Sequence, residues 1–588
     1  MFSMQSLQFP RSNLEKVKKL YLNLVYGRYD LNLTGSSLVL HPNSKVSFNS
    51  YLNSFYESYW EQYTTLSSIT LSVKFKGDCI ISIYRDSPMN GCYLLLDSHL
   101  VSSEMKTIEL NLSLDDLIPD SGRIFIDIDS KDTHTEIESI EFCIPNTIDK
   151  KLSIGLCTFN KEDFLCQNLE SLVDLSKKLP NLSKIIIVNQ GDLFSNKKLV
   201  KLIEANPTLI QVYKQGNLGG AGGFTRTLYE ASQNEISDLH LLMDDDIILD
   251  ANVIKTAFCF ASLAKREIAV GGQMLDLLRP NFMHEYGGKL DHNGNIKAIF
   301  HNLDVADMAN FHLFNKVTKI DYNAWWFCMI PTKKIAEINL PAPIFIRGDD
   351  LEYGLRLKNN GVETVGLPGV ALWHEPFYAK IGGWQTYYDF RNRMILTSSY
   401  EQLKSENVNK LFLKIYNLLL CHDYQSVKLI LEAINDFAKG TALFDVPANE
   451  VHKKVSDIAK KFAPVSLEST VFNPAGENEL KPKWISTERR INFAKQTMLL
   501  YMNDFSKHKA KHLWDRDVAP QNVACKPYIK TNGIQSYFYL YSPDKEIFRQ
   551  LLSEILKARK TYINAIKEDN WNTINEYKKF DFWKTIFS

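Results

Sequence analysis

Short segments of alternating apolar and polar residues dominate the first quarter of the chain, between residues 36 and 145. The clearest of them are 69–75, 79–84, 107–112 and 123–129. This alternation is typical of strands with one buried face, and turn-forming pairs such as Asn90-Gly91 separate the segments. Strands this short and this closely spaced predict an antiparallel β-sandwich or jelly roll over residues 1–148.

From about residue 149 the pattern changes to continuous apolar runs that alternate with helical segments. A helix is expected at 163–178, and a Gly-rich loop at 216–223 leads into another at 224–232. Strands alternating with helices indicate an α/β domain with a mainly parallel sheet, here over residues 149–395. Buried strands are predicted at 151–157, 184–189, 209–213 and 238–243.

After residue 395 helical periodicity takes over. Amphipathic segments lie near 408–438, 449–462, 487–506 and 545–568. They predict a C-terminal helical domain over residues 396–588. The final segment, 577–587, mixes aromatic and basic residues, so it is expected either to pack onto the helical domain or to dip into lipid headgroups.

Composition narrows the function classes. Lys plus Arg and Asp plus Glu each number 68, so the net charge is zero and nothing predicts a nucleic-acid-binding surface. The nine cysteines are scattered and form no Cys-x-x-Cys pair, which indicates reduced thiols of a cytoplasmic protein. No segment predicts a signal peptide or a spanning helix, so any membrane association is expected to be peripheral, at the inner face of the cell membrane.

Three consecutive carboxylates, Asp244, Asp245 and Asp246, follow the strand predicted at 238–243. Like charges repel, so an ordered chain needs a group that neutralises them. In an extended chain Asp244 and Asp246 point to the same side. Two oxygen donors at the carboxyl end of a strand suit a divalent metal and, through it, a diphosphate. An acidic turn that caps the next helix is the alternative.

The Gly-rich segment 216–223 lets the backbone approach a ligand closely and opens a helix, which suits an anion. A dinucleotide-binding loop is the rival interpretation. The spacing is not Gly-x-Gly-x-x-Gly and no ribose-binding acid is clearly placed, so the sequence disfavours that rival.

Asp349 and Asp350 stand at the start of a predicted helix. Carboxylates there either cap the helix or accept a proton from a hydroxyl nucleophile. His374 can complete a set of metal ligands only if the fold brings it to the acidic triplet, and otherwise it is structural. Trp325 and Trp326 are adjacent and cannot both face one core, so at least one is expected to line a pocket, where indole suits a sugar.

These motifs occur together in a known family. Residues 150–395 resemble the inverting glycosyltransferases of the GT-A fold that include bacterial rhamnosyl- and galactofuranosyltransferases. Within that family the likeness is greatest to the galactan-polymerising enzymes of mycobacteria, which also have a β-rich N-terminal and a helical C-terminal region. The matching segments are Thr158-Phe-Asn-Lys, Val188-Asn-Gln-Gly, Gly216-Asn-Leu-Gly-Gly, Met243-Asp-Asp-Asp, Trp325-Trp, Gly348-Asp-Asp-Leu-Glu, Trp373-His-Glu and Tyr387-Tyr-Asp-Phe-Arg-Asn.

The resemblance implies roles for individual residues. Asp244, Asp246 and His374 would hold Mn²⁺ or Mg²⁺ against the donor diphosphate, and Asp350 would be the general base with Asp349 beside it. The family often has Arg where this chain has Lys161, which keeps the charge but loses the planar fork. The implied nucleotide contacts are Phe159, Lys161, Gln190, Asn217, Gly219 and Asp245, and the implied sugar and acceptor pocket is Glu285, Trp325 and Trp326.

The resemblance also implies a function. A metal-dependent transferase would move galactofuranose from UDP-galactofuranose onto a hydroxyl of a growing cell-surface polysaccharide that is carried on a lipid. A rhamnosyl- or other hexosyltransferase that uses a dTDP- or UDP-sugar is the first rival. A non-catalytic carbohydrate-binding or scaffolding protein is the second, and assembly as a homo-oligomer stays open.

Overall fold

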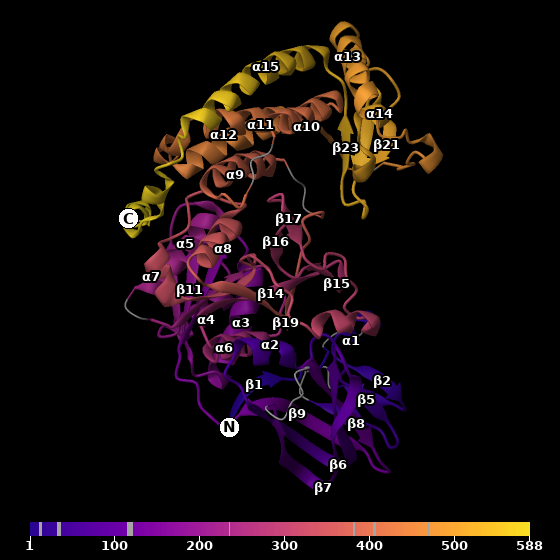
Figure 1. Cartoon of the computed structure of the whole chain (residues 1–588), viewed down its shortest axis with the longest axis vertical. Coiled ribbons are helices and arrows are strands. Elements are labelled where there is room, and N and C mark those ends of the chain that lie inside the picture. The colour runs from indigo at the N-terminus through magenta and orange to yellow at the C-terminus, as the bar shows by residue number, and fades with distance from the viewer. Residues whose placement is uncertain are drawn as a thin grey trace.

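The computed structural model describes residues 1–10, 14–31, 37–114, 121–233, 236–379, 383–403, 407–468 and 470–587. Three regions follow one another along its long axis: a β-rich region at the N-terminus, a central α/β region and a helical region. The chain then turns back, so the C-terminal end lies beside the α/β region and away from the far tip of the helical one (Figure 1).

The N-terminal region is sheet-rich, as the alternating pattern predicts. Nine strands form one continuous hydrogen-bonded network that has two halves. The long strand β6 joins its halves, because residues 70–76 pair with β9 and residues 79–86 with β8. The exchange of neighbours falls at Gly77, where φ is +123° and a Cβ would meet the carbonyl oxygen of His134 at 2.5 Å. The elements are β1 (Phe2–Ser6), α1 (Glu15–Lys18), β2 (Asn23–Tyr26), β3 (Tyr29–Leu31), β4 (Leu38–Leu40), β5 (Lys45–Ser47), α2 (Glu57–Tyr63), β6 (Ser68–Ser87), β7 (Gly91–Ser113), β8 (Arg123–Ser130) and β9 (Thr135–Ile144).

The central region is the expected α/β domain. Its sheet has the order β12-β11-β10-β13-β18-β14-β15, with β19 paired to β14, and the first four strands run parallel. The strands are β10 (Leu152–Thr158), β11 (Leu182–Asn189), β12 (Ile210–Lys214), β13 (Leu239–Asp244), β14 (Ile268–Asp276), β15 (Arg279–Glu285), β18 (Phe327–Pro331) and β19 (Glu363–His374), with a small hairpin of β16 (Gly288–Leu290) and β17 (Ile296–Ala298). The helices are α3 (Glu162–Lys178), α4 (Lys197–Ala205), α5 (Gly219–Ser232), α6 (Asn252–Ser262), η1 (Met308–Phe314), α7 (Thr332–Ile338) and α8 (Asp349–Asn359).

The Gly-rich segment corrects one prediction, because helix α5 begins at Gly219 and not at Phe224. Glycine is a poor helix former, so the sequence alone predicts a loop there. One local and one tertiary hydrogen bond stabilise the start of this helix. Asn217 Oδ1 accepts a hydrogen bond from the Gly219 amide at 2.9 Å, and the Phe345 carbonyl accepts one from Ala221 at 2.9 Å. The last five residues of the expected loop, 219–223, are therefore helical.

The C-terminal region is mainly helical, with the helices close to their predicted positions. It also contains a four-stranded sheet, β20-β23-β22-β21, that the sequence did not predict because each strand has only three or four residues. The proposed domain limit at 395/396 falls inside α9, which packs against α11. The helices are α9 (Gln385–Ser399), α10 (Val408–Leu420), α11 (Tyr424–Phe437), η2 (Gly440–Asp445), α12 (Ala448–Lys461), η3 (Glu477–Glu479), α13 (Ser486–Met502), η4 (Asp515–Asp517), α14 (Pro520–Val523), α15 (Lys545–Glu568), η5 (Ile574–Lys578) and α16 (Phe580–Phe587), and the strands are β20 (Val465–Leu467), β21 (Lys511–Trp514), β22 (Tyr528–Thr531) and β23 (Phe538–Tyr541).

The end of the chain corrects a second prediction in part. Tyr577 does contact Phe444 of the helical region, with ring centroids 5.4 Å apart. The helix that follows packs elsewhere: Trp583 is buried in an apolar cluster with Phe224, Trp325 and Tyr353 of the α/β region. The aromatic segment thus packs against both regions, on the helical domain through Tyr577 and on the α/β domain through Trp583.

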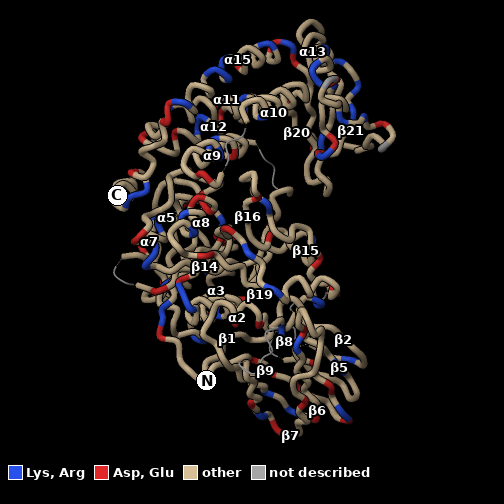
Figure 2. Tube along the Cα trace, in the orientation of Figure 1, with Lys and Arg blue, Asp and Glu red and all other residues tan. Residues whose placement is uncertain are grey.

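Charge and hydropathy fit the expectations from composition. Acidic and basic residues are interspersed in all three regions (Figure 2). The nine cysteines, each within the described residues, are free thiols, and seven of them are buried. Within the described ranges, every helix falls short of the length or hydropathy needed to cross a bilayer.

Candidate active site

Asp244, Asp246 and His374 come together at the carboxyl ends of β13 and β19. Two backbone hydrogen bonds between Ile248 and Trp373, of 2.8 and 2.9 Å, tie the segment after the acidic triplet to the end of β19. One ligand atom of each of the three side chains lies within 4.8 Å of the others. His374 Nε2 lies 3.1 Å from Asp246 Oδ1. The fold therefore satisfies the condition under which His374 becomes a metal-ligand candidate.

The chemistry of this group fits a divalent cation. His374 is 4 % exposed, and within the described residues its buried Nδ1 has no hydrogen-bond partner. Buried polar atoms without partners are uncommon, and an imidazole beside two carboxylates is a donor set that Mn²⁺ accepts. Lys161 Nζ also lies 3.5 Å from Asp246 Oδ2, so the residue that replaces the family's Arg still brings its charge to the triplet.

Asp245 lies on the inner side of the same turn. Burial, together with the charges of Asp246 and Asp244, raises the pKa of its carboxyl to about 7. Asn168 of α3 holds this turn by donating from Nδ2 to the carbonyls of Asp245 and Ile247, at 2.8 and 3.1 Å. The sequence did not single out Asn168, because nothing in a helical asparagine reveals a partner 77 residues away.

Asp349 and Asp350 open helix α8. The chain enters the helix through two residues in the left-handed region, Arg347 (φ +70°) and Gly348 (φ +84°). Burial raises the pKa of both carboxyls, and the charge of Asp350 raises that of Asp349 further. These carboxyls are therefore more basic than ordinary surface aspartates.

One cavity of about 600 Å³ joins the predicted groups. Burial, followed by the charge of Asp350, raises the pKa of Glu285 to about 8, so this cavity carboxyl holds a proton near neutral pH. The two tryptophans belong to different apolar clusters, and both line the cavity. The predicted residues that line the cavity are Asp244, Glu285, Trp325, Trp326, Asp349 and Asp350.

The predicted nucleotide contacts lie outside the lining of this cavity. Phe159 is 51 % exposed. Gln190 is buried beneath the Gly-rich segment, where its Oε1 accepts from the Leu218 amide at 2.8 Å and its Nε2 donates to the Gly219 carbonyl at 2.9 Å. Asn217 caps Gly219, as described above. Gln190 and Asn217 thus stabilise the first turn of α5 by hydrogen bonds to its backbone.

Sequence reasoning missed a polar rim of the cavity formed by Arg347 and helix α9. Arg347 Nε lies 3.7 Å from Asp389 Oδ1, and its guanidinium lies 4.5 Å from the centre of the Phe377 ring. Burial raises the pKa of Asp389. Asn392 donates from Nδ2 to three backbone carbonyls of the segment that leads into α8, including those of Ile346 at 2.6 Å and Arg347 at 2.8 Å. The motif Tyr387-Tyr-Asp-Phe-Arg-Asn marked this helix without revealing these roles.

Comparison with known proteins gives matches over most of the chain. Residues 4–145 match the family model described as "Galactofuranosyltransferase 2 N-terminal", and residues 151–393 match the one described as "Glycosyltransferase like family 2". The chain is 31 % identical over 450 residues to galactofuranosyltransferase GlfT2 of Mycolicibacterium smegmatis, an overlap of 72 % of this chain and 69 % of that protein.

The likeness to GlfT2 of Mycobacterium tuberculosis is 30 % over 454 residues, or 72 % of this chain and 70 % of that protein. Among solved structures, the chain is similar to GalNAc-T7 with UDP, GalNAc and Mn²⁺, at 13 % identity, a TM-score of 0.34, and coverage of 46 % of this chain and 54 % of that one. The second matched segment, 151–393, contains the metal-ligand candidates and the acidic pair of α8.

Proposed function

The chain belongs to the GlfT2 family of galactofuranosyltransferases and is a glycosyltransferase with a GT-A catalytic domain, and from this premise we propose that it transfers galactofuranose from UDP-galactofuranose to a glycan hydroxyl with inversion. One observation carries the proposal: a single cavity is lined both by Asp244 of the metal-ligand group and by the acidic pair of α8. The non-catalytic alternative falls with the family assignment.

Asp244, Asp246 and His374 are the residues that would hold Mn²⁺ or Mg²⁺. When bound, such an ion neutralises charge that develops on the departing diphosphate. Lys161 adds a positive charge on the same side of the site. In this proposal the nucleotide lies between the acidic triplet and the first turn of α5, where Gly220 lines the cavity and a helix N-terminus suits a phosphate group.

Asp350 is the proposed general base. Its carboxyl accepts the proton of the acceptor hydroxyl, and its burial-raised pKa makes it a stronger base than an exposed aspartate. Glu285, protonated near neutral pH, donates a hydrogen bond into the same cavity. Trp325 and Trp326 pack against the C–H faces of the sugars and exclude water. Attack from the side opposite the leaving nucleotide inverts the anomeric centre.

The acceptor is proposed to be a growing cell-surface polysaccharide on a lipid carrier, at the cytoplasmic face of the membrane. This part of the proposal rests on the family alone. A rhamnosyl- or other hexosyltransferase that uses a dTDP-sugar remains the alternative, and choice of donor separates the two.

A donor panel tests the proposal. Release of the nucleoside diphosphate is measured from UDP-galactofuranose, UDP-galactopyranose and dTDP-rhamnose, each with Mn²⁺ or with a chelator. We expect turnover of UDP-galactofuranose that disappears with the chelator. Preference for dTDP-rhamnose would move the assignment to the alternative.

Calorimetry tests the metal ligands separately. Asp246→Ala and His374→Ala are each expected to weaken Mn²⁺-dependent UDP binding by about tenfold or more, because loss of groups around a metal costs affinity on this order. His292→Ala, which removes an exposed imidazole outside the site, is the control. Unchanged affinity in His374→Ala would return that residue to a structural role.

A further inference from the structure

The last turns of the chain hold the segment that leads into α8. We name residues 574–587, which comprise η5 and α16, the C-terminal clasp. Trp583 of the clasp is 2 % exposed and donates from Nε1 to the Pro341 carbonyl at 2.9 Å. The Lys578 carbonyl accepts from the Leu340 amide at 3.0 Å. The clasp therefore fixes the backbone at Leu340 and Pro341, at the start of the segment that leads to the acidic pair eight residues later.

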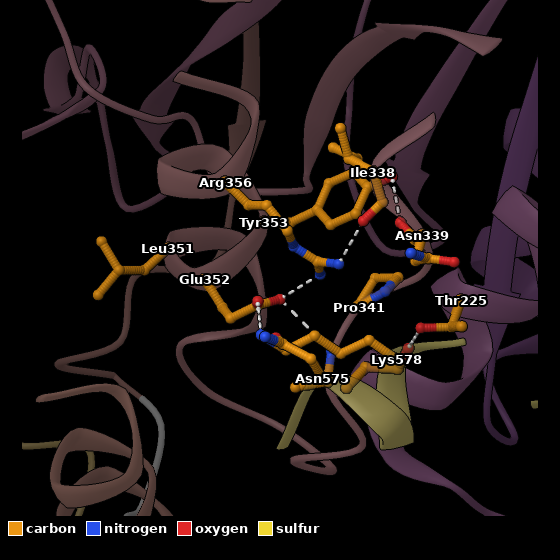
Figure 3. A network of polar contacts seen from close by, with 12 residues as sticks. Thr225, Ile338, Asn339, Pro341, Leu351, Glu352, Tyr353, Arg356, Asn575 and Lys578 are labelled. Atoms are coloured by element: carbon orange, nitrogen blue, oxygen red, sulfur yellow. Dashed lines mark hydrogen bonds and ion pairs between the residues drawn. The ribbon is translucent and has the colours of Figure 1, made fainter. Parts of the chain in front are cut away.

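The clasp also reaches α8 itself, at Glu352 (Figure 3). Glu352 is fully buried, two residues after Asp350. Its Oε1 accepts from the Tyr400 hydroxyl at 2.5 Å and lies 3.1 Å from Lys578 Nζ, while its Oε2 accepts from Arg356 Nη2 at 2.7 Å. A residue at the far end of the chain thus completes the environment of a carboxylate in the first turn of the proposed catalytic helix.

The charges in this network oppose burial. Burial alone would raise the pKa of Glu352, but the positive charges of Arg356 and Lys578 and the hydrogen bond from Tyr400 hold it down at about 2. The carboxylate is therefore ionised at neutral pH although its side chain is fully buried. Removing one cationic partner of Glu352 would leave part of its buried charge uncompensated, so the Glu352 side chain would shift toward its remaining contacts.

The segment between α7 and α8 depends on such outside support. Asn339, Phe345 and Arg347 have φ values of +67°, +72° and +70°, a region that non-glycine residues rarely adopt. Strained backbone of this kind persists only where its surroundings hold it. Asn392 holds the segment from the α9 side, and the clasp holds it from the other side at Leu340 and Pro341.

We propose that Lys578 is a positioning residue of the transfer reaction, which acts through Glu352 to fix the first turn of α8 and so the place of Asp350 in the cavity. The inference rests on the proposed function, in which Asp350 is the base. Because the metal-ligand group stands on β13 and β19 while Lys578 contacts α8, losing Lys578 should slow transfer and leave nucleotide binding intact.

Lys578→Met in the full chain is the test, since it removes the charge and keeps most of the side-chain volume. We expect kcat for transfer to fall about 10- to 100-fold, the range that a displacement of about 1 Å produces. The dissociation constant of UDP with Mn²⁺ should stay within about twofold of the wild-type value. Hydrogen exchange at amides 349–353 should become faster. In the double variant Lys578→Met/Glu352→Gln, kcat should be no lower than in the less active of the two single variants, because the effects of substitutions at coupled residues do not add.

Two lysines serve as matched controls. Lys579→Met removes the exposed neighbour, which pairs with Glu576, and should change nothing. Lys255→Met removes a lysine that is 6 % exposed and bonded to Ser3 and Ser6, far from α8, and should lower stability without lowering kcat. If Lys578→Met does not fold, Asn575→Ala replaces it. That variant removes an exposed partner of Lys578 Nζ, 3.1 Å away, and should lower kcat about threefold.

The outcomes separate the inference from the function on which it rests. Wild-type kcat in Lys578→Met, or in Asn575→Ala where that variant is used, would overturn the inference. A parallel loss of kcat and UDP affinity would also overturn it, because that pattern marks a merely structural residue. If Asp350→Asn keeps full transfer, the proposed base is wrong. Hydrogen exchange then still decides whether Lys578 orders α8, and unchanged exchange would overturn that too.

Discussion

Two carboxylates on helix α8, only two residues apart, have opposite environments. Asp350 faces the cavity, where burial raises its pKa and Asp244 adds a like charge. Glu352 faces the C-terminal clasp, where Arg356, Lys578 and Tyr400 pull its pKa down to about 2 against burial. The first is the proposed proton acceptor, and the second is a fixed anion.

The difference shows how one helix can carry both strain and support. A buried carboxylate whose charge is only partly compensated, as that of Asp350 is by Arg347, destabilises the fold and is typical of functional sites. A buried carboxylate with two cationic partners and a hydroxyl fixes geometry. We infer that the ion pairs of Glu352 hold the first turn of α8 in place and so hold the buried carboxyl of Asp350 in the cavity.

The largest expected effect comes from the cavity side. Asp350→Asn should lower kcat for transfer roughly 10²- to 10⁴-fold, because the amide cannot take the proton. UDP affinity with Mn²⁺ should stay within about twofold, and the melting temperature should not fall, since the change removes an unfavourable buried charge. Steady-state transfer assays, calorimetry and thermal unfolding measure the three quantities. Near-normal turnover would refute the base assignment.

On the clasp side, Glu352→Gln should lower the free energy of unfolding by about 3 kcal/mol, because it leaves Arg356 and Lys578 buried without their counter-charge. Urea unfolding at pH 7 measures this. Glu337→Gln, which breaks a surface pair with Lys334, is the control and should leave the free energy of unfolding close to the wild-type value. An equal loss of unfolding free energy in the two variants would show that Glu352 stabilises the fold no more than a surface carboxylate does, and its contrast with Asp350 would fail.

The pH dependence of stability sharpens the same contrast. The Glu352 pKa is lowered from 4.5 to about 2 in the folded state, so its contribution is present above pH 4.5 and is lost as pH falls toward 2. The gap in unfolding free energy between wild type and Glu352→Gln should therefore narrow by about 2 kcal/mol between about pH 5.5 and pH 3. A gap that does not change with pH would show that Glu352 is not held as an anion.

The smallest expected effect is at Trp583. Trp583→Phe keeps a ring but removes the hydrogen bond to Pro341, which should lower stability by about 1 kcal/mol and kcat a few-fold. Trp571→Phe removes the same type of bond, to the Phe437 carbonyl at 3.1 Å, within the helical region. It should match the stability loss and leave kcat unchanged. A kcat loss of the same size in both variants would contradict a specific link from the clasp to α8.

The cavity side of α8 was predictable from the sequence and the clasp side was not. Asp244, Asp246, Asp349 and Asp350 stand at the ends of periodic segments, so local pattern and chain order lead to them. His374 was conditional, and the backbone bonds between Ile248 and Trp373 supplied the missing condition.

Long-range pairs account for the rest. Lys578 meets Glu352 across more than 200 residues, and no local pattern in either segment encodes that pairing. The sequence likewise indicated that the aromatic segment around Trp583 packs against the protein, but it did not indicate that Trp583 packs on the α/β region. The first turn of α5 was missed because hydrogen bonds to the neighbouring Asn217 side chain and to the distant Phe345 carbonyl outweigh the low helix propensity of glycine.

Stereochemical analysis of the product tests the central claim most directly. The full chain is incubated with UDP-galactofuranose, Mn²⁺ and a short galactofuranose acceptor, and the new linkage is examined by NMR. The account predicts an extended glycan whose new anomeric centre is inverted relative to the donor, formed by the wild type and Lys579→Met but almost absent with Asp350→Asn. A product with the donor's own configuration, or transfer that survives Asp350→Asn, would contradict it.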